Sequence, residues 1–175
     1  MDYLTKPTNR QQLRELSIVF RNLFGLNKSC KVPVIEMLDK LPDAFPGSSY
    51  IIVEDSQLPK NVPAQCVPTG ENTFEIQIKN SVYKGAHEKE IGGYRAHIVH
   101  EMCHVFLYLI GFRPVMQRSF LNGELPPYKS VEWQAKALCG EIMMPFDKTE
   151  SLSAFQIMKI YGVSENQAKY RKKYN

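Results

Sequence analysis

Three of the chain's four histidines lie within eight positions, in the stretch HIVHEMCH at residues 97–104. In an α-helix each residue advances by about 100°, so His100 and His104 lie on one face, one turn apart. Two imidazoles in this arrangement can bind one tetrahedral Zn²⁺ from the same side. Glu101 is displaced around the helix and is better placed to hold a water molecule on that ion. The spacing therefore predicts a hydrolytic metal site in which the carboxylate takes the proton of the water.

The same residues also fit an ordinary helix whose buried histidines are hydrogen-bonded. A bare HExxH pattern arises by chance in roughly one chain in fifty of this length, so the motif alone is only moderately specific. The surrounding helix, predicted at 94–111, is otherwise strongly apolar and should belong to the core. Burying two imidazoles and a carboxylate there costs free energy unless a partner such as a metal ion satisfies them. This consideration favours the metal site.

A catalytic zinc ion needs three protein ligands and one open position. Glu132 lies on a second strong helix, predicted at 130–145, and can close the site from another direction. Ala135 and Cys139 are small residues on the same side of that helix, which would let the two helices approach closely.

Two other residues near the motif are weaker candidates for the third ligand. His97 lies one turn before His100 and can flank the site, but three successive turns of one helix surround a tetrahedral ion poorly. Cys103 points about 100° away from His104 and is a poor ligand.

The elements that must position these residues include both helices and strands. Besides the two helices above, periodicity and end signals predict helices at 8–25 and 33–41, and two short helices within 150–173. The apolar run at 50–54 is typical of a buried strand, and the alternation at 73–79 predicts a half-exposed strand. Prolines argue against a long regular element between these strands; they are Pro59, Pro63 and Pro68. We expect an α+β fold in which a small, mostly antiparallel sheet packs on the active-site helix, with additional helices.

The composition indicates a soluble globular protein, with 43% hydrophobic and 23% charged residues. We expect one main domain at 1–149 and a short helical appendage at 150–175 packed on it. No apolar run is long enough to span a membrane, and no signal peptide is visible. The four cysteines are scattered singly and are expected to be reduced thiols. We therefore expect a cytoplasmic protein with no membrane partner.

The net charge of +4 and the basic ending at 169–175 raise the question of nucleic-acid binding. Residues 151–171 fit a helix-turn-helix in which Ser164 caps the second helix. Few cations support this, and no three-helix core surrounds the segment. We interpret it as a packing element and expect no direct nucleic-acid binding.

The motifs together resemble those of the ImmA/IrrE metallo-endopeptidases, which are often encoded on phages and other mobile elements. RAHIVHEMCH is similar to the family's R-F-T-I-A-H-E-L-G-H, and EWQAKALCGEIMMP follows its E-x-x-A-x-x-F-A-x-x-L-L-M-P in register. IQIKNSVYKGA, YGVSENQAKYR and NRQQLRELSIVFRNLFGL resemble other segments of the family, so the likeness spans nearly the whole chain. Cys103 departs from the usual glycine, and His97 stands where a small hydroxyl residue is expected.

The resemblance implies a zincin-like fold and a gluzincin-like site with one Zn²⁺ per chain. In this site His100, His104 and Glu132 bind the metal, and Glu101 is the catalytic glutamate. The family also implies a protein substrate, a helix-turn-helix transcriptional repressor, whose cleavage switches genes on. Neither departure removes a ligand.

Peptide hydrolysis also needs a donor that stabilises the tetrahedral oxyanion. Four side chains remain open for this role; they are Tyr94, His97, Tyr108 and Tyr128. We expect the strand at 73–79 to lie at the sheet edge beside the cleft, where a substrate can add as an extended strand.

Two alternatives remain beside the peptidase. The first is a non-catalytic, metal-stabilised regulator that binds a repressor or DNA. The second is a purely structural zinc site, against which Glu101 argues, because a closed structural site needs no base.

Overall fold

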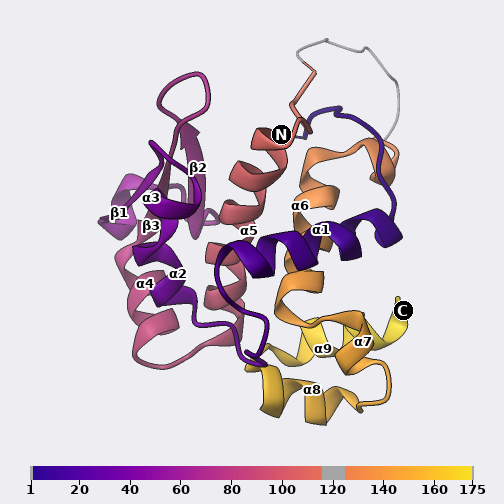
Figure 1. The fold of residues 1–175 in the computed structure, drawn as a ribbon. Coiled ribbons are helices and arrows are strands. Elements are labelled where there is room, and N and C mark those ends of the chain that lie inside the picture. Colours follow the sequence, from indigo (N-terminus) through magenta and orange to yellow (C-terminus); the bar gives the residue numbers. More distant parts are fainter. Residues whose placement is uncertain (1, 116–124, 175) are drawn as a thin grey trace.

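The computed structural model describes residues 2–115 and 125–174, and Figure 1 shows their arrangement. The α-helices are α1 (Arg10–Leu23), α2 (Val34–Asp39), α3 (Leu41–Ala44), α4 (Asn80–His87), α5 (Gly92–Leu109), α6 (Val131–Met143), α7 (Phe146–Thr149), α8 (Ala154–Tyr161) and α9 (Glu165–Lys173). The strands are β1 (Ser49–Val53), β2 (Ala64–Pro68) and β3 (Phe74–Lys79), and short 3-10 turns lie at η1 (Asp55–Gln57) and η2 (Pro127–Lys129). The described part of the chain is therefore an α+β fold with nine α-helices and one small sheet, which confirms the expected class.

The three strands are ordered β1-β3-β2, with β3 parallel to β1 and antiparallel to β2. The sheet is thus mixed, and the expectation of a mostly antiparallel sheet is wrong. The strand expected at the sheet edge, 73–79, is the central one, and β2 takes the edge instead. β2 was not predicted because of its prolines, but they lie where a strand tolerates them: Pro68 is the last residue of β2, and Pro63 directly precedes it. The carbonyl of Pro63 accepts a hydrogen bond from the backbone N–H of Lys79 on β3.

Burial departs from the expected pattern in β1 and at the end of β3, and agrees with it along the rest of β3. In β1, expected to be buried, Ile51 and Ile52 are 39% and 45% exposed; among the described residues this is an edge strand paired with β3 alone. In β3 the expected alternation holds, and Phe74, Ile76 and Ile78 are buried. Lys79, the last residue of β3, lies on the opposite face from these three residues and is also buried.

Helix α5 lies between the sheet and α6, and α1 packs across α6 (Figure 1). Helix α5 begins at Gly92, two residues before the predicted start at 94. A Cβ on Gly92 would lie 2.6 Å from the backbone at Val163 and Ser164, so the absent side chain lets the α8–α9 turn approach. Helix α4, just before α5, was not predicted as a helix.

The C-terminal helices pack on the rest of the chain through apolar and charged contacts. Ile157, Tyr161 and Ala168 belong to the hydrophobic core cluster. Arg171 on α9 makes two hydrogen bonds, of 2.7 and 2.6 Å, to the carboxylate of Glu141 on α6, and both side chains are buried. Within the described residues, none of the helices combines the length and apolar character needed to cross a membrane.

We expect Arg171→Ala to lower the free energy of unfolding by about 3 kcal/mol, because it leaves the buried Glu141 carboxylate without its main partner. The control Lys173→Ala removes an exposed cation from the same helix and should change the stability by less than about 0.5 kcal/mol. Urea denaturation followed by circular dichroism measures both. Equal stability of Arg171→Ala and the parent protein would contradict the role assigned to this ion pair.

Candidate metal centre

Helix α5 presents its apolar residues to the core and two histidines to α6. Ile98, Val99 and Met102 are fully buried, whereas His100 and His104 are each 17% exposed. The Nε2 atoms of the two histidines lie 3.1 Å apart. Two lone pairs cannot face each other at this distance, so either one ring donates its Nε2–H to the other or both rings bind one metal ion.

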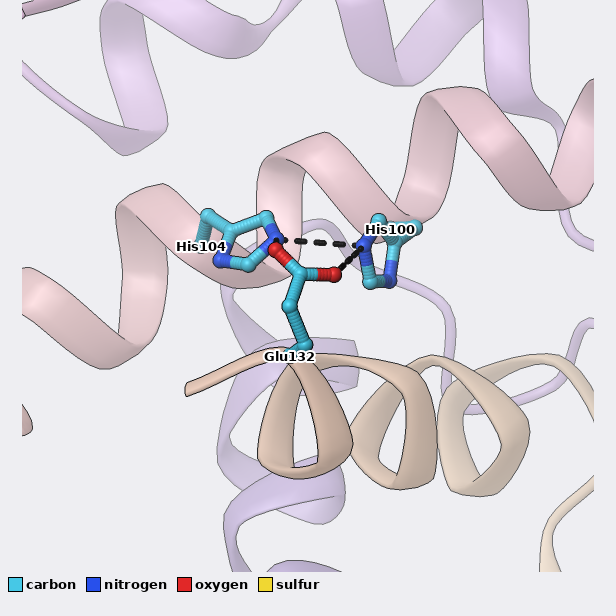
Figure 2. Close-up of side chains that lie close together, drawn as sticks. All are labelled: His100, His104 and Glu132. Carbon is cyan, nitrogen blue, oxygen red and sulfur yellow. Dashed lines mark hydrogen bonds and ion pairs between the residues drawn. The ribbon is translucent and has the colours of Figure 1, made fainter. Parts of the chain in front are cut away.

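Glu132, in the first turn of α6, approaches both histidines from the opposite side (Figure 2). Its Oε2 lies 3.3 Å from Nε2 of His100, and its Oε1 lies 3.3 Å from Nε2 of His104. In a tetrahedral zinc site with ligand bonds of about 2.0–2.1 Å, ligand atoms are separated by about 3.3 Å. Among the described residues, these three side chains form the only cluster with metal-ligand spacing. The structure thus brings together the three side chains named from the sequence.

The electrostatic environment of the cluster favours a bound cation. Hydrogen bonds from His100 and His104 hold the pKa of Glu132 well below its usual range. Burial lowers the pKa of His104, but the hydrogen bond to Glu132 and the charges of Glu101 and Glu132 outweigh it, so the pKa is raised overall. A proton or a divalent cation would satisfy this excess of negative charge, and the divalent ion leaves both imidazoles neutral.

Glu101 lies beside the cluster, between α5 and β2. Burial raises the pKa of its carboxyl group, against the opposing effect of His100 and His104, and its carboxylate faces the backbone N–H of Cys66 on β2. A carboxylate that is partly desolvated near a cation site is suited to accept a proton near neutral pH. Burial also raises the pKa of the Cys66 thiol to about 12, and Cys66 is not part of the cluster with metal-ligand spacing.

The other thiol near the motif, Cys103, points away from the cluster. It is completely buried with Cys139 between α5 and α6, and the Cys139 thiol donates to the carbonyl of Ala96 at 3.4 Å. Burial, followed by the neighbouring Cys139, raises the pKa of Cys103. All four cysteines are free, as expected. Ala135 is also fully buried in this region, and these small side chains allow the two helices to pack closely.

The four side chains considered for oxyanion stabilisation are placed differently. Tyr94 and His97 line a cleft of about 650 Å³ beside the N-terminal half of α5. Tyr108 donates its hydroxyl to the carbonyl of Glu71 at 3.3 Å, in the turn between β2 and β3. Tyr128 is 49% exposed ahead of α6.

Sequence reasoning missed the segment that holds the start of α6. The carboxylate of Asp2 accepts hydrogen bonds from the Ser130 hydroxyl at 2.5 Å and from the backbone N–H of Glu132 at 3.2 Å. Leu4 forms isolated bridges to both Val115, after α5, and Ser130, before α6. The N-terminal segment therefore ties together the chain at the ends of the two helices that carry the cluster. This contact joins segments that lie far apart in the sequence, so no local sequence pattern could have indicated it.

No protein-family model matches the sequence, and no curated protein sequence matches it.

We expect the purified protein to bind about one zinc ion per chain, and both His100→Ala and Glu132→Ala to lose it, because three ligands are needed for a tight open site. Metal analysis by mass spectrometry after gel filtration measures the occupancy. As a matched control, Glu36→Ala removes an exposed carboxylate from α2 and should keep the full content. Full zinc content in Glu132→Ala would remove Glu132 from the ligand set and direct attention to His97.

Proposed function

We propose that this protein is a zinc-dependent endopeptidase of the ImmA/IrrE type with a zincin-like fold. The observation that carries the proposal is the spacing of the three ligand atoms of His100, His104 and Glu132, at 3.1–3.3 Å. The adjacent Glu101 supports hydrolysis over a structural role, because a closed structural site has no use for a base. The sequence resemblance supports a protein substrate, a helix-turn-helix transcriptional repressor.

In the proposed mechanism, His100, His104 and Glu132 hold the ion. When bound, zinc lowers the pKa of its water and polarises the substrate carbonyl. Glu101 accepts the proton of the attacking water and passes it to the leaving amine. Burial of this carboxylate raises its pKa, which suits a group that must first accept a proton and then donate it.

The open edge of β2 supports an extended substrate, in place of the strand first expected there. Backbone hydrogen bonds lie at both ends of the β2–β3 pairing: the N–H of Thr69 donates to the carbonyl of Thr73, and the N–H of Lys79 donates to the carbonyl of Pro63. Because backbone groups alternate along a strand, the N–H and C=O of Cys66 then point to the open edge. That N–H also faces Glu101, so a substrate strand added to β2 would pass the catalytic carboxylate.

The alternative function is a non-catalytic regulator that binds a repressor or DNA, and the α8–α9 pair is the observation that favours it. Ser164 caps α9 with a complete capping box, as in a helix-turn-helix. Two contacts weigh against DNA binding: Arg171 is buried against Glu141, and Lys169 is paired with Glu165 at 2.6 Å. Few free cations remain on α9 to contact phosphates.

Glu101→Gln should keep the fold and the zinc ion and lose proteolysis, because it removes the base without removing a ligand. Cleavage of a co-expressed or purified candidate repressor, followed by gel electrophoresis and mass spectrometry, measures activity. Glu75→Gln, which changes a half-buried carboxylate on β3, is the matched control and should retain cleavage. If Glu101→Gln still cuts at the parent rate, the mechanism is wrong.

For the regulator alternative, we expect duplex DNA to bind with a dissociation constant no tighter than about 10 µM at physiological salt, because only two or three cations of α9 can reach phosphates. Fluorescence anisotropy with a labelled duplex at two salt concentrations measures this. Submicromolar, salt-resistant binding that is lost in Lys172→Glu/Lys173→Glu would favour the regulator.

A further inference from the structure

The cleft that His97 lines has two cationic side chains in its wall. Its wall combines the end of β3 and the start of α4 with the chain around η1 and with α5. The residues used below are Asp55, Lys60, Lys79, Ser81 and His97.

Lys79 supplies a buried positive charge to this wall. The side chain is 6% exposed, and its ammonium group donates to the carbonyls of Pro59 at 2.7 Å and Lys60 at 3.4 Å. An ammonium has three donors, and within the described residues no carboxylate forms an ion pair with it. Carbonyl groups satisfy hydrogen bonds without neutralising the charge, so a buried cation in this position favours a nearby anion.

Among the described residues that line the wall, Asp55 is the only carboxylate, and it is already hydrogen-bonded. Asp55 accepts a hydrogen bond from the backbone N–H of Ser81 at 3.0 Å, at the start of α4. Hydrogen bonds from Ser81 lower the pKa of Asp55, and the charge of Lys79 contributes less. Lys60 adds an exposed second cation. Two cations and one engaged carboxylate leave the cleft with a net positive charge.

The cleft also lies within reach of a substrate held at the cluster. His97, in its wall, lies three residues before His100 on α5, a rise of about 4.5 Å along the helix. An extended chain advances about 3.3 Å per residue. A residue one or two positions from the reacting carbonyl can therefore place its side chain in the cleft.

We propose that this cleft binds an acidic side chain, aspartate or glutamate, one or two residues from the cleaved bond. The position of this side chain relative to the cleaved bond rests on the proposed function. The affinity of the cleft for a carboxylate does not rest on it. Lys79 and Lys60 are the specificity-determining residues. The negative charge of Asp55 opposes theirs, so it limits how strongly the cleft prefers an acidic side chain over a neutral one.

Two measurements separate this inference from the proposed function. The first titrates the zinc-loaded protein with N-acetyl-glutamate amide or N-acetyl-glutamine amide and follows backbone amide shifts by NMR. We expect saturable shifts at cleft residues with the acidic probe, and binding of the neutral probe about three- to fivefold weaker, the difference typical of one partly exposed charge pair. The second profiles cleavage of a peptide library and reads the residues around each cut.

Lys60→Glu is the main variant, because this exposed residue can change without disturbing the core. It should abolish the preference for glutamate over glutamine in both measurements. Lys28→Glu makes the same charge change at an exposed position outside the cleft wall and should keep the preference. Lys79→Met, with its fold checked by circular dichroism, tests the buried cation.

Equal affinity for the two probes, or shifts that map away from the cleft, would overturn the inference. A cleavage profile without an acidic residue within two positions of the cut would also overturn it, while leaving the peptidase intact. Specific binding of the acidic probe by a protein that cuts no peptide would support the cleft and contradict the proposed function.

Discussion

The packing of α5 against α6 is the contact on which the candidate site depends. Its ligand atoms come from both helices and must stay within about 3.3 Å of one another to share an ion. Ala135, Cys103 and Cys139 fill the space between the helices with small side chains. We expect a larger residue at any of these positions to push α6 away from α5 and so to move Glu132 away from the two histidines.

Both ends of the chain reinforce this contact. Near the N-terminus, Asp2 caps the start of α6, and Leu4 bridges the segments that follow α5 and precede α6. Near the C-terminus, Arg171 holds α9 on α6 through the buried carboxylate of Glu141. Such buried ion pairs are strongly destabilising to break, so the ends of the chain restrict how α6 can move. Stability and site geometry are therefore coupled in this protein.

The sequence predicted the local features well and the long-range ones poorly. The helix carrying His100, Glu101 and His104 and the helix carrying Glu132 were found because periodicity and caps are local signals. The edge position of β2 and the exposure of Ile51 were missed, since strand order is set by pairing partners distant in sequence. The role of Asp2 was missed for the same reason. Spacing indicated the candidate ligands, but only the fold could show that Glu132 reaches both imidazoles.

Zinc K-edge X-ray absorption of the metal-loaded protein tests the central claim most directly, because it reports the atoms bound to the ion. The account predicts about four nitrogen and oxygen neighbours at about 2.0–2.1 Å, with the multiple-scattering signature of two imidazoles and no sulfur. That pattern matches two histidines, one carboxylate and one water. A sulfur neighbour at about 2.3 Å, or the signature of a single imidazole, would contradict it.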